Sequence, residues 1–89
     1  AALEAGLVAR VVAASELESV AMDYATRLAA LPTVALGLIR KQVALALTET
    51  LPDLMVVEAR HQALASATED CAEGVRAFIE KRAPGFKGR

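Results

Sequence analysis

The sequence has one cysteine, no tryptophan and only 3% aromatic residues. A single thiol, Cys71, cannot form a disulfide within the chain, which excludes a disulfide-stapled domain and fits a reducing compartment such as the cytoplasm. No apolar run reaches the ~18–20 residues that cross a bilayer, and no basic segment precedes an apolar one at the N-terminus. Neither a membrane helix nor a signal peptide is therefore predicted. The net charge of −1 also argues against a nucleic-acid partner.

Aliphatic side chains are abundant instead. The 89 residues are 55% hydrophobic and form one domain at most. A chain of this size buries only ~60–65% of its unfolded surface, so its own core is small. The surplus predicts that part of the apolar surface packs against a partner or against another part of the same protein. Because the sequence starts at Ala1 rather than at a methionine, we expect it to be a piece of a longer protein.

Apolar residues recur at helical spacing through most of the chain, which predicts an all-α fold. A short extended entry at residues 7–14, rich in valine, follows a helix end that Gly6 closes. Three main amphipathic helices are expected after this entry. Capping patterns and prolines place the helical segments at residues 15–30, 32–47, 50–65 and 68–82.

Short polar residues mark the predicted helix starts. Ser15 and Glu18 have the spacing of a capping box, in which each side chain satisfies a free backbone N–H. Thr50 and Asp53 are expected to cap the third segment. Gly37 lowers the helix propensity of the second segment by roughly 1 kcal/mol relative to alanine. A close packing contact is therefore predicted at Gly37.

The stretch from residue 68 to residue 89 combines a helix start, an aromatic residue and a basic end. Asp70 and Glu73 again have capping-box spacing. Phe78 and Lys81 lie three residues apart, hence on neighbouring surface of one helix. From periodicity alone, Phe78 is a core residue and Lys81 a solvated cation. The excess of basic side chains nevertheless predicts an anion site, formed by Arg76, Lys81, Arg82, Lys87 and Arg89.

This same stretch carries a resemblance to a known family. Residues 73–89, EGVRAFIEKRAPGFKGR, resemble the C-terminal signature of the crotonase superfamily, the enoyl-CoA hydratases and isomerases. The signature reads E-G-x-x-A-F-x-E-K-R-x-P-x-F-x-G. The segments GLVARVV at residues 6–12 and PTVALGLIRKQV at residues 32–43 extend the resemblance over essentially the whole chain. The matching residues are Glu73, Gly74, Ala77, Phe78, Glu80, Lys81, Arg82, Pro84, Phe86 and Gly88.

The resemblance implies that residues 1–89 are the helical C-terminal domain that follows a crotonase core and packs subunits into trimers or hexamers. The whole protein would then be a cytoplasmic lyase or isomerase that acts on an acyl-CoA in fatty-acid metabolism. Coenzyme A enters as part of the thioester substrate, so neither a cofactor nor a metal is implied. The matching phenylalanine and lysine of the family lie near the adenine and phosphates of coenzyme A. Phe78 and Lys81 are therefore the candidate CoA-binding residues.

No catalytic residue is expected within this chain. The resemblance places the family's catalytic carboxylates and oxyanion-binding N–H groups upstream of this region. His61 has no second histidine or cysteine beside it, and only Glu58 could orient it, so a structural role is expected. Cys71 is expected to be a small packed residue rather than a nucleophile. The alternative hypothesis is a stand-alone helical interaction module with no ligand, and an upstream catalytic domain would distinguish the two.

Overall fold

The computed structural model describes all 89 residues and contains no strand. A single turn of 3₁₀ helix at Ala14–Glu16 leads into α1 (Leu17–Ala29), which is followed by α2 (Thr33–Leu45), α3 (Leu51–Ser66) and α4 (Glu69–Glu80). The prediction of an all-α fold is thus confirmed. The four helices of the structure correspond to the four helical segments, where three main helices were expected.

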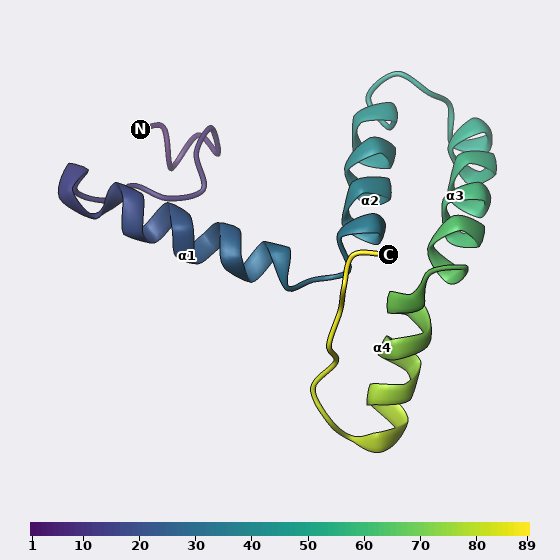
Figure 1. Cartoon of the computed structure of the whole chain (residues 1–89). Coiled ribbons are helices and arrows are strands. Elements are labelled where there is room, and N and C mark those ends of the chain that lie inside the picture. The colour runs from purple at the N-terminus through teal and green to yellow at the C-terminus, as the bar shows by residue number, and fades with distance from the viewer.

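The helices form an open arrangement rather than a closed bundle. α2 and α3 run side by side in opposite directions, and α4 continues from the lower end of α3 (Figure 1). Residues 81–89 then turn back along α4 and end beside the start of α2, whereas α1 projects away from the other helices (Figure 1). The molecule accordingly measures 42 × 39 × 19 Å along its principal axes.

Threonine side chains cap the last two helices. Thr50 Oγ1 accepts a hydrogen bond from the N–H of Asp53 at 3.4 Å, as predicted. Thr68 Oγ1 accepts one from the N–H of Cys71 at 3.0 Å. The capping box predicted at Ser15 is wrong, because Ser15 lies inside the 3₁₀ turn and makes no capping bond. An N-cap residue needs an extended backbone, which a residue within a helical turn does not have.

The first residues form the helix end that Gly6 was expected to close. The N–H of Leu7 donates to the carbonyl of Ala2 at 3.0 Å, and the N–H of Gly6 donates to that of Leu3 at 3.1 Å. Gly6 has a φ of 71°, the left-handed conformation of this kind of helix end. The extended entry at residues 7–14 contains no strand, because no other segment pairs with it.

The chain has almost no core of its own. Only Ala77 and Asp70 are buried, while every helix carries large apolar side chains that stay exposed. Leu47, for example, is 87% exposed. No atom beyond the neighbouring residues and the backbone of α2 lies within 4 Å of the position that a Cβ on Gly37 would occupy, so the close contact predicted there is absent from this chain. The helices therefore present apolar faces that another surface can cover.

None of the four helices alone has the length and apolar character that a membrane span requires. The segments Ala14–Ala29 and Thr33–Leu45 reach the required length and composition only when taken together, and they are bent by 102° at the break between them.

We expect the isolated chain to self-associate. Ile39 and Val43 are exposed on α2, and removing apolar surface of this kind from water contributes about 25 cal/mol per Å². Analytical ultracentrifugation at micromolar concentration should therefore show dimers or larger species. The double variant Ile39→Lys/Val43→Lys should shift the distribution toward monomer. A clean monomer of the unchanged chain across the concentration range would contradict this expectation.

Candidate functional site

The end of α4 holds Lys81 in a left-handed backbone conformation, with φ 54° and ψ 41°. The N–H of Lys81 donates to the carbonyl of Phe78 at 3.3 Å, and the N–H of Arg82 donates to that of Ala77 at 3.1 Å. These two bonds make the Schellman motif that ends many helices. Lys81 is the only residue other than glycine with a positive φ. Glycine is favoured at such a position, since a side chain there costs roughly 1–2 kcal/mol.

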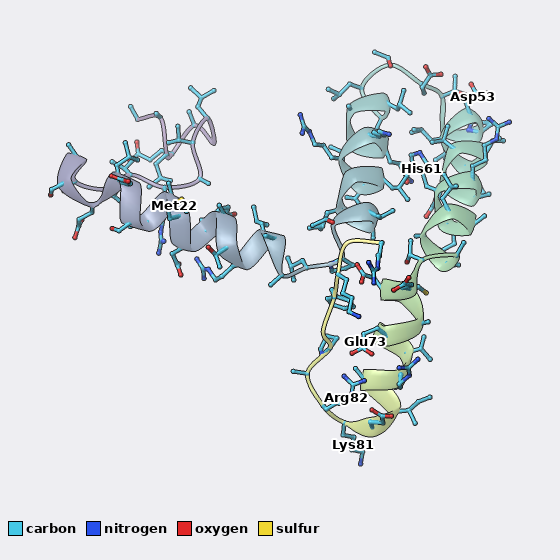
Figure 2. All side chains as sticks on the ribbon, viewed as in Figure 1. Met22, Asp53, His61, Glu73, Lys81 and Arg82 are labelled. Carbon is cyan, nitrogen blue, oxygen red and sulfur yellow. The ribbon has the colours of Figure 1, made fainter.

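The two candidate CoA-binding residues lie together at this end of the helix. Phe78 is 85% exposed, so within this chain it is not the core residue that periodicity alone suggests. Lys81 is also exposed, and its ammonium forms no ion pair with a carboxylate of the chain. Figure 2 shows Lys81 at the far tip of α4, pointing away from Glu73 and Arg82. Both side chains are therefore accessible to a ligand or to another subunit.

A carboxylate–guanidinium pair, which we call the Glu73–Arg82 clasp, joins α4 to the tail. Arg82 Nη1 donates to Glu73 Oε1 at 2.6 Å, and Nη2 donates to Oε2 at 3.0 Å. The N–H of Gly85 donates to Glu73 Oε1 at 2.9 Å. Arg82 Nε also donates to Glu80 at 2.6 Å. The residue directly after Lys81 is thus held by a two-bond contact, which is the strong form of an arginine–carboxylate pair.

The clasp keeps both partners charged. The hydrogen bonds from Arg82, followed by the one from the N–H of Gly85, lower the pKa of Glu73 from its ordinary 4.5 to about 2. The bonds to Glu73 and Glu80 raise the pKa of Arg82 further above its usual value. Because the folded pKa of the acid is lowered, the stabilisation it contributes is complete above pH 4.5 and disappears as the pH falls through about 2. Glu73 is therefore a fixed anion at neutral pH.

A second carboxylate, which we call the tail anchor, holds the last residues of the chain. Asp70 is only 3% exposed; its Oδ1 accepts from the N–H of Lys87 at 2.7 Å and its Oδ2 from that of Gly88 at 2.8 Å. The N–H of Asp70 donates to the carbonyl of Arg89 at 3.0 Å. The predicted capping box of Asp70 and Glu73 is therefore wrong. Both carboxylates bind the returning tail, and neither caps its own helix.

Close packing completes the attachment of the tail. A Cβ on Gly74 would lie 3.5 Å from the ring of Phe86, so this ring rests against the helix backbone at Gly74. Gly88 has a φ of 73°, and a Cβ there would come within 2.5 Å of Thr33 Oγ1. The end of the tail thus fits between α4 and the first turn of α2 only because residue 88 lacks a side chain.

The five basic residues predicted to form one anion site fall into two groups, those that pair with a carboxylate and those that do not. Three of them lie within 4 Å of a carboxylate of this chain: Arg76, Arg82 and Arg89. Lys81 and Lys87 are the two that do not pair. The prediction of a single anion site formed by all five residues is therefore wrong, since Arg82 and Arg89 hold the tail in place. The free positive charge near Phe78 is that of Lys81.

The remaining candidates do not form a catalytic group. His61 points from α3 toward α2 and lines a groove of about 500 Å³ between these helices (Figure 2). Its Nδ1 is buried without a hydrogen-bond partner, although Glu58 lines the same groove. Cys71 is a free thiol and is exposed rather than packed as predicted, since it lies in the first turn of α4. No three His, Cys, Asp or Glu side chains are grouped as metal ligands.

Known proteins resemble the chain over nearly its whole length. The sequence model of the enoyl-CoA hydratase/isomerase family matches residues 1–89. A 1,2-epoxyphenylacetyl-CoA isomerase of Escherichia coli K12 is 40% identical over 86 residues, which are 97% of this chain and 33% of that protein. A probable enoyl-CoA hydratase of Mycobacterium bovis is 40% identical over 84 residues, which are 94% of this chain and 33% of that protein.

Solved structures agree with this assignment. An enoyl-CoA hydratase from Geobacillus kaustophilus HTA426 matches with a TM-score of 0.89 and 36% identity, over 99% of this chain and 33% of that one. Another structure from this organism, described as the other form of enoyl-CoA hydratase subunit I, matches with a TM-score of 0.91 and 41% identity. The match covers 99% of this chain and 34% of that one. The chain spans about a third of the length of these relatives and corresponds to their C-terminal part. The resemblance read from residues 73–89 is thus confirmed: the chain belongs to the enoyl-CoA hydratase/isomerase family.

Proposed function

We propose that residues 1–89 are the helical C-terminal domain of an enzyme that hydrates or isomerises the double bond of an enoyl-CoA thioester. The match of the family model to every residue supports this assignment. In this proposal coenzyme A is part of the substrate rather than a bound cofactor. The domain has two roles in the whole protein: it joins subunits, and it binds the nucleotide end of the substrate.

The observation that carries the binding role is the geometry of Lys81. A lysine occupies a left-handed position that favours glycine, and its ammonium has no carboxylate partner. Phe78, whose carbonyl accepts from the N–H of Lys81, is 85% exposed. Strain of this kind is retained where the side chain has a task. An ammonium binds phosphate as a point charge, and an aromatic face can stack on a base. Lys81 therefore binds a phosphate of CoA and Phe78 stacks on its adenine.

The role in subunit association rests on the uncovered apolar faces. α1 and the segment before it line a groove of about 540 Å³. Its apolar lining includes Leu17, Val20, Tyr24 and Leu28. Leu17, Tyr24 and Leu28 are exposed in the single chain. A surface like this matches the apolar centre of a permanent interface between subunits. The proposed assembly is a homo-oligomer, either a trimer or a hexamer.

Replacing Lys81 by alanine tests the binding role in the full-length enzyme. We expect KM for the enoyl-CoA to rise about fivefold with little change in kcat, which corresponds to the loss of ~1 kcal/mol for one charged hydrogen bond. The nucleotide lies far from the reacting carbons, so its contact contributes equally in the ground and transition states. Steady-state kinetics should compare the enoyl-CoA with the same acyl group on pantetheine, which lacks the nucleotide.

The matched control is Lys87→Ala, which removes the other unpaired lysine of the tail. This variant should leave KM for both substrates unchanged. The rise in KM for Lys81→Ala should also shrink as salt is added, because the contact is electrostatic. An equal loss with the CoA and pantetheine substrates would mean that Lys81 is structural. Under the alternative hypothesis of a stand-alone interaction module, the full-length protein would have no activity on an enoyl-CoA.

A further inference from the structure

We propose that Glu73 is a positioning residue: by holding Arg82, it fixes the turn at Lys81 and so sets where the ammonium meets the nucleotide end of the substrate. This inference rests on the proposed function of Lys81. It assigns a task to a carboxylate that touches no ligand and that does not cap its own helix.

The contacts of Glu73 converge on the chain just after Lys81. Two nitrogens of Arg82 and the N–H of Gly85 all donate to this one carboxylate, at 2.6 to 3.0 Å. Arg82 is the neighbour of Lys81, and its backbone N–H also closes the Schellman turn on Ala77. These bonds tie the chain on the C-terminal side of Lys81 to α4 and so limit how far the Lys81 backbone can turn.

The turn depends on this support because lysine does not favour the left-handed conformation. A glycine at residue 81 would hold the turn without help, whereas a lysine released from the clasp relaxes toward the ordinary region of backbone space. Without the clasp, only the two Schellman hydrogen bonds would hold the turn. Their lengths are 3.1 and 3.3 Å, whereas the bond from Arg82 Nη1 to Glu73 measures 2.6 Å. Breaking the contact between Glu73 and Arg82 should thus broaden the range of positions that the Lys81 ammonium samples.

The clasp acts through Lys81 and does not contact the nucleotide itself. Figure 2 shows Glu73 and Arg82 facing each other between α4 and the tail, while Lys81 points away from both. The side chain of Glu73 is only 19% exposed, and the guanidinium of Arg82 is occupied by Glu73 and Glu80. Each of the three guanidinium nitrogens of Arg82 already donates to a carboxylate of this chain, so its charge is compensated where that of Lys81 is not.

A double-mutant cycle in the full-length enzyme separates positioning from a general structural role. We expect Glu73→Gln to raise KM for the enoyl-CoA but not for the pantetheine analogue. The increase should not exceed the roughly fivefold increase expected for Lys81→Ala, because the clasp is proposed to act only through Lys81. In the Lys81→Ala background, Glu73→Gln should add nothing further. Arg82→Lys, which keeps the charge but loses the two-bond contact, should behave like Glu73→Gln and serves in its place if that variant does not fold.

The matched control is Asp23→Asn, which removes an exposed ion pair with Arg27 on α1 and should leave both KM values unchanged. Circular dichroism and the oligomeric state should match those of the unchanged enzyme for every variant. If Glu73→Gln and Lys81→Ala raise KM additively, or if Glu73→Gln impairs both substrates equally, the positioning inference is wrong while the role of Lys81 stands. If Lys81→Ala has no nucleotide-dependent effect, the proposed function fails and the inference fails with it.

Discussion

The isolated chain should show no hydration of crotonyl-CoA above the uncatalysed rate. Its two partly or fully buried carboxylates are engaged: Glu73 is paired with Arg82, and Asp70 accepts two backbone N–H groups. His61 has no hydrogen-bonded carboxylate to orient it. Preorganised oxyanion donors commonly contribute ~10²–10³-fold each, and the family resemblance places them upstream of this chain. The loss relative to the full-length enzyme should therefore be complete within the sensitivity of the assay.

The measurement is the loss of enoyl-CoA absorbance, with the full-length enzyme as the positive control at the same molar concentration. The chain should be purified twice by different methods, since a trace of host hydratase would imitate activity. Turnover that persists at constant specific activity through both purifications would show that residues 1–89 contain a catalytic site.

Asp70→Ala should release the C-terminal tail. The change leaves the N–H groups of Lys87 and Gly88 without the acceptors they have at 2.7 and 2.8 Å. Losing a buried acceptor of this kind costs ~2 kcal/mol, which predicts about 30-fold faster amide exchange at these two residues. Hydrogen exchange of the full-length protein, followed by mass spectrometry of the C-terminal peptide, measures the effect directly.

Two variants control for this result. Asp70→Asn keeps one oxygen acceptor and should give an intermediate exchange rate. Asp23→Ala removes a carboxylate whose side chain is 64% exposed on α1, and it should not change exchange in the tail. Unchanged protection of Lys87 and Gly88 in Asp70→Ala would mean that packing of Phe86 and Gly88, rather than the tail anchor, keeps the tail in place.

The sequence predicts the helices well because their signals are local. Thr50 is followed by a proline and an acid in the first turn, and it caps α3 as expected. Gly6 adopts the positive φ that its position after a helix end predicts. Ser15 also has an acid three residues on but does not cap a helix, because a 3₁₀ turn begins one residue before it. Boundaries of this kind depend on backbone geometry that the spacing of two polar residues does not determine.

The candidate site is only partly predictable from the sequence. The family signature locates Phe78 and Lys81, and helical spacing places them on neighbouring surface. The tasks of Asp70 and Glu73 could not be found, because a carboxylate that caps its helix and one that binds a returning tail have the same spacing. Pro84 and Gly85 indicate that the helix stops but not that the chain reverses along it. The pairing of Arg82 with Glu73 and of Arg89 with Glu69 follows from this reversal.

The tail contacts have a consequence for folding kinetics. They join residues close in sequence: Arg82 is nine residues from Glu73, and Lys87 and Gly88 are 17 and 18 residues from Asp70. Closing loops this short costs little chain entropy, and local contacts of this kind form early. The donors and acceptors of these hydrogen bonds all lie within residues 70–88. The contacts that support the left-handed turn at Lys81 thus lie within residues 68–89, and we expect this turn to form early in folding.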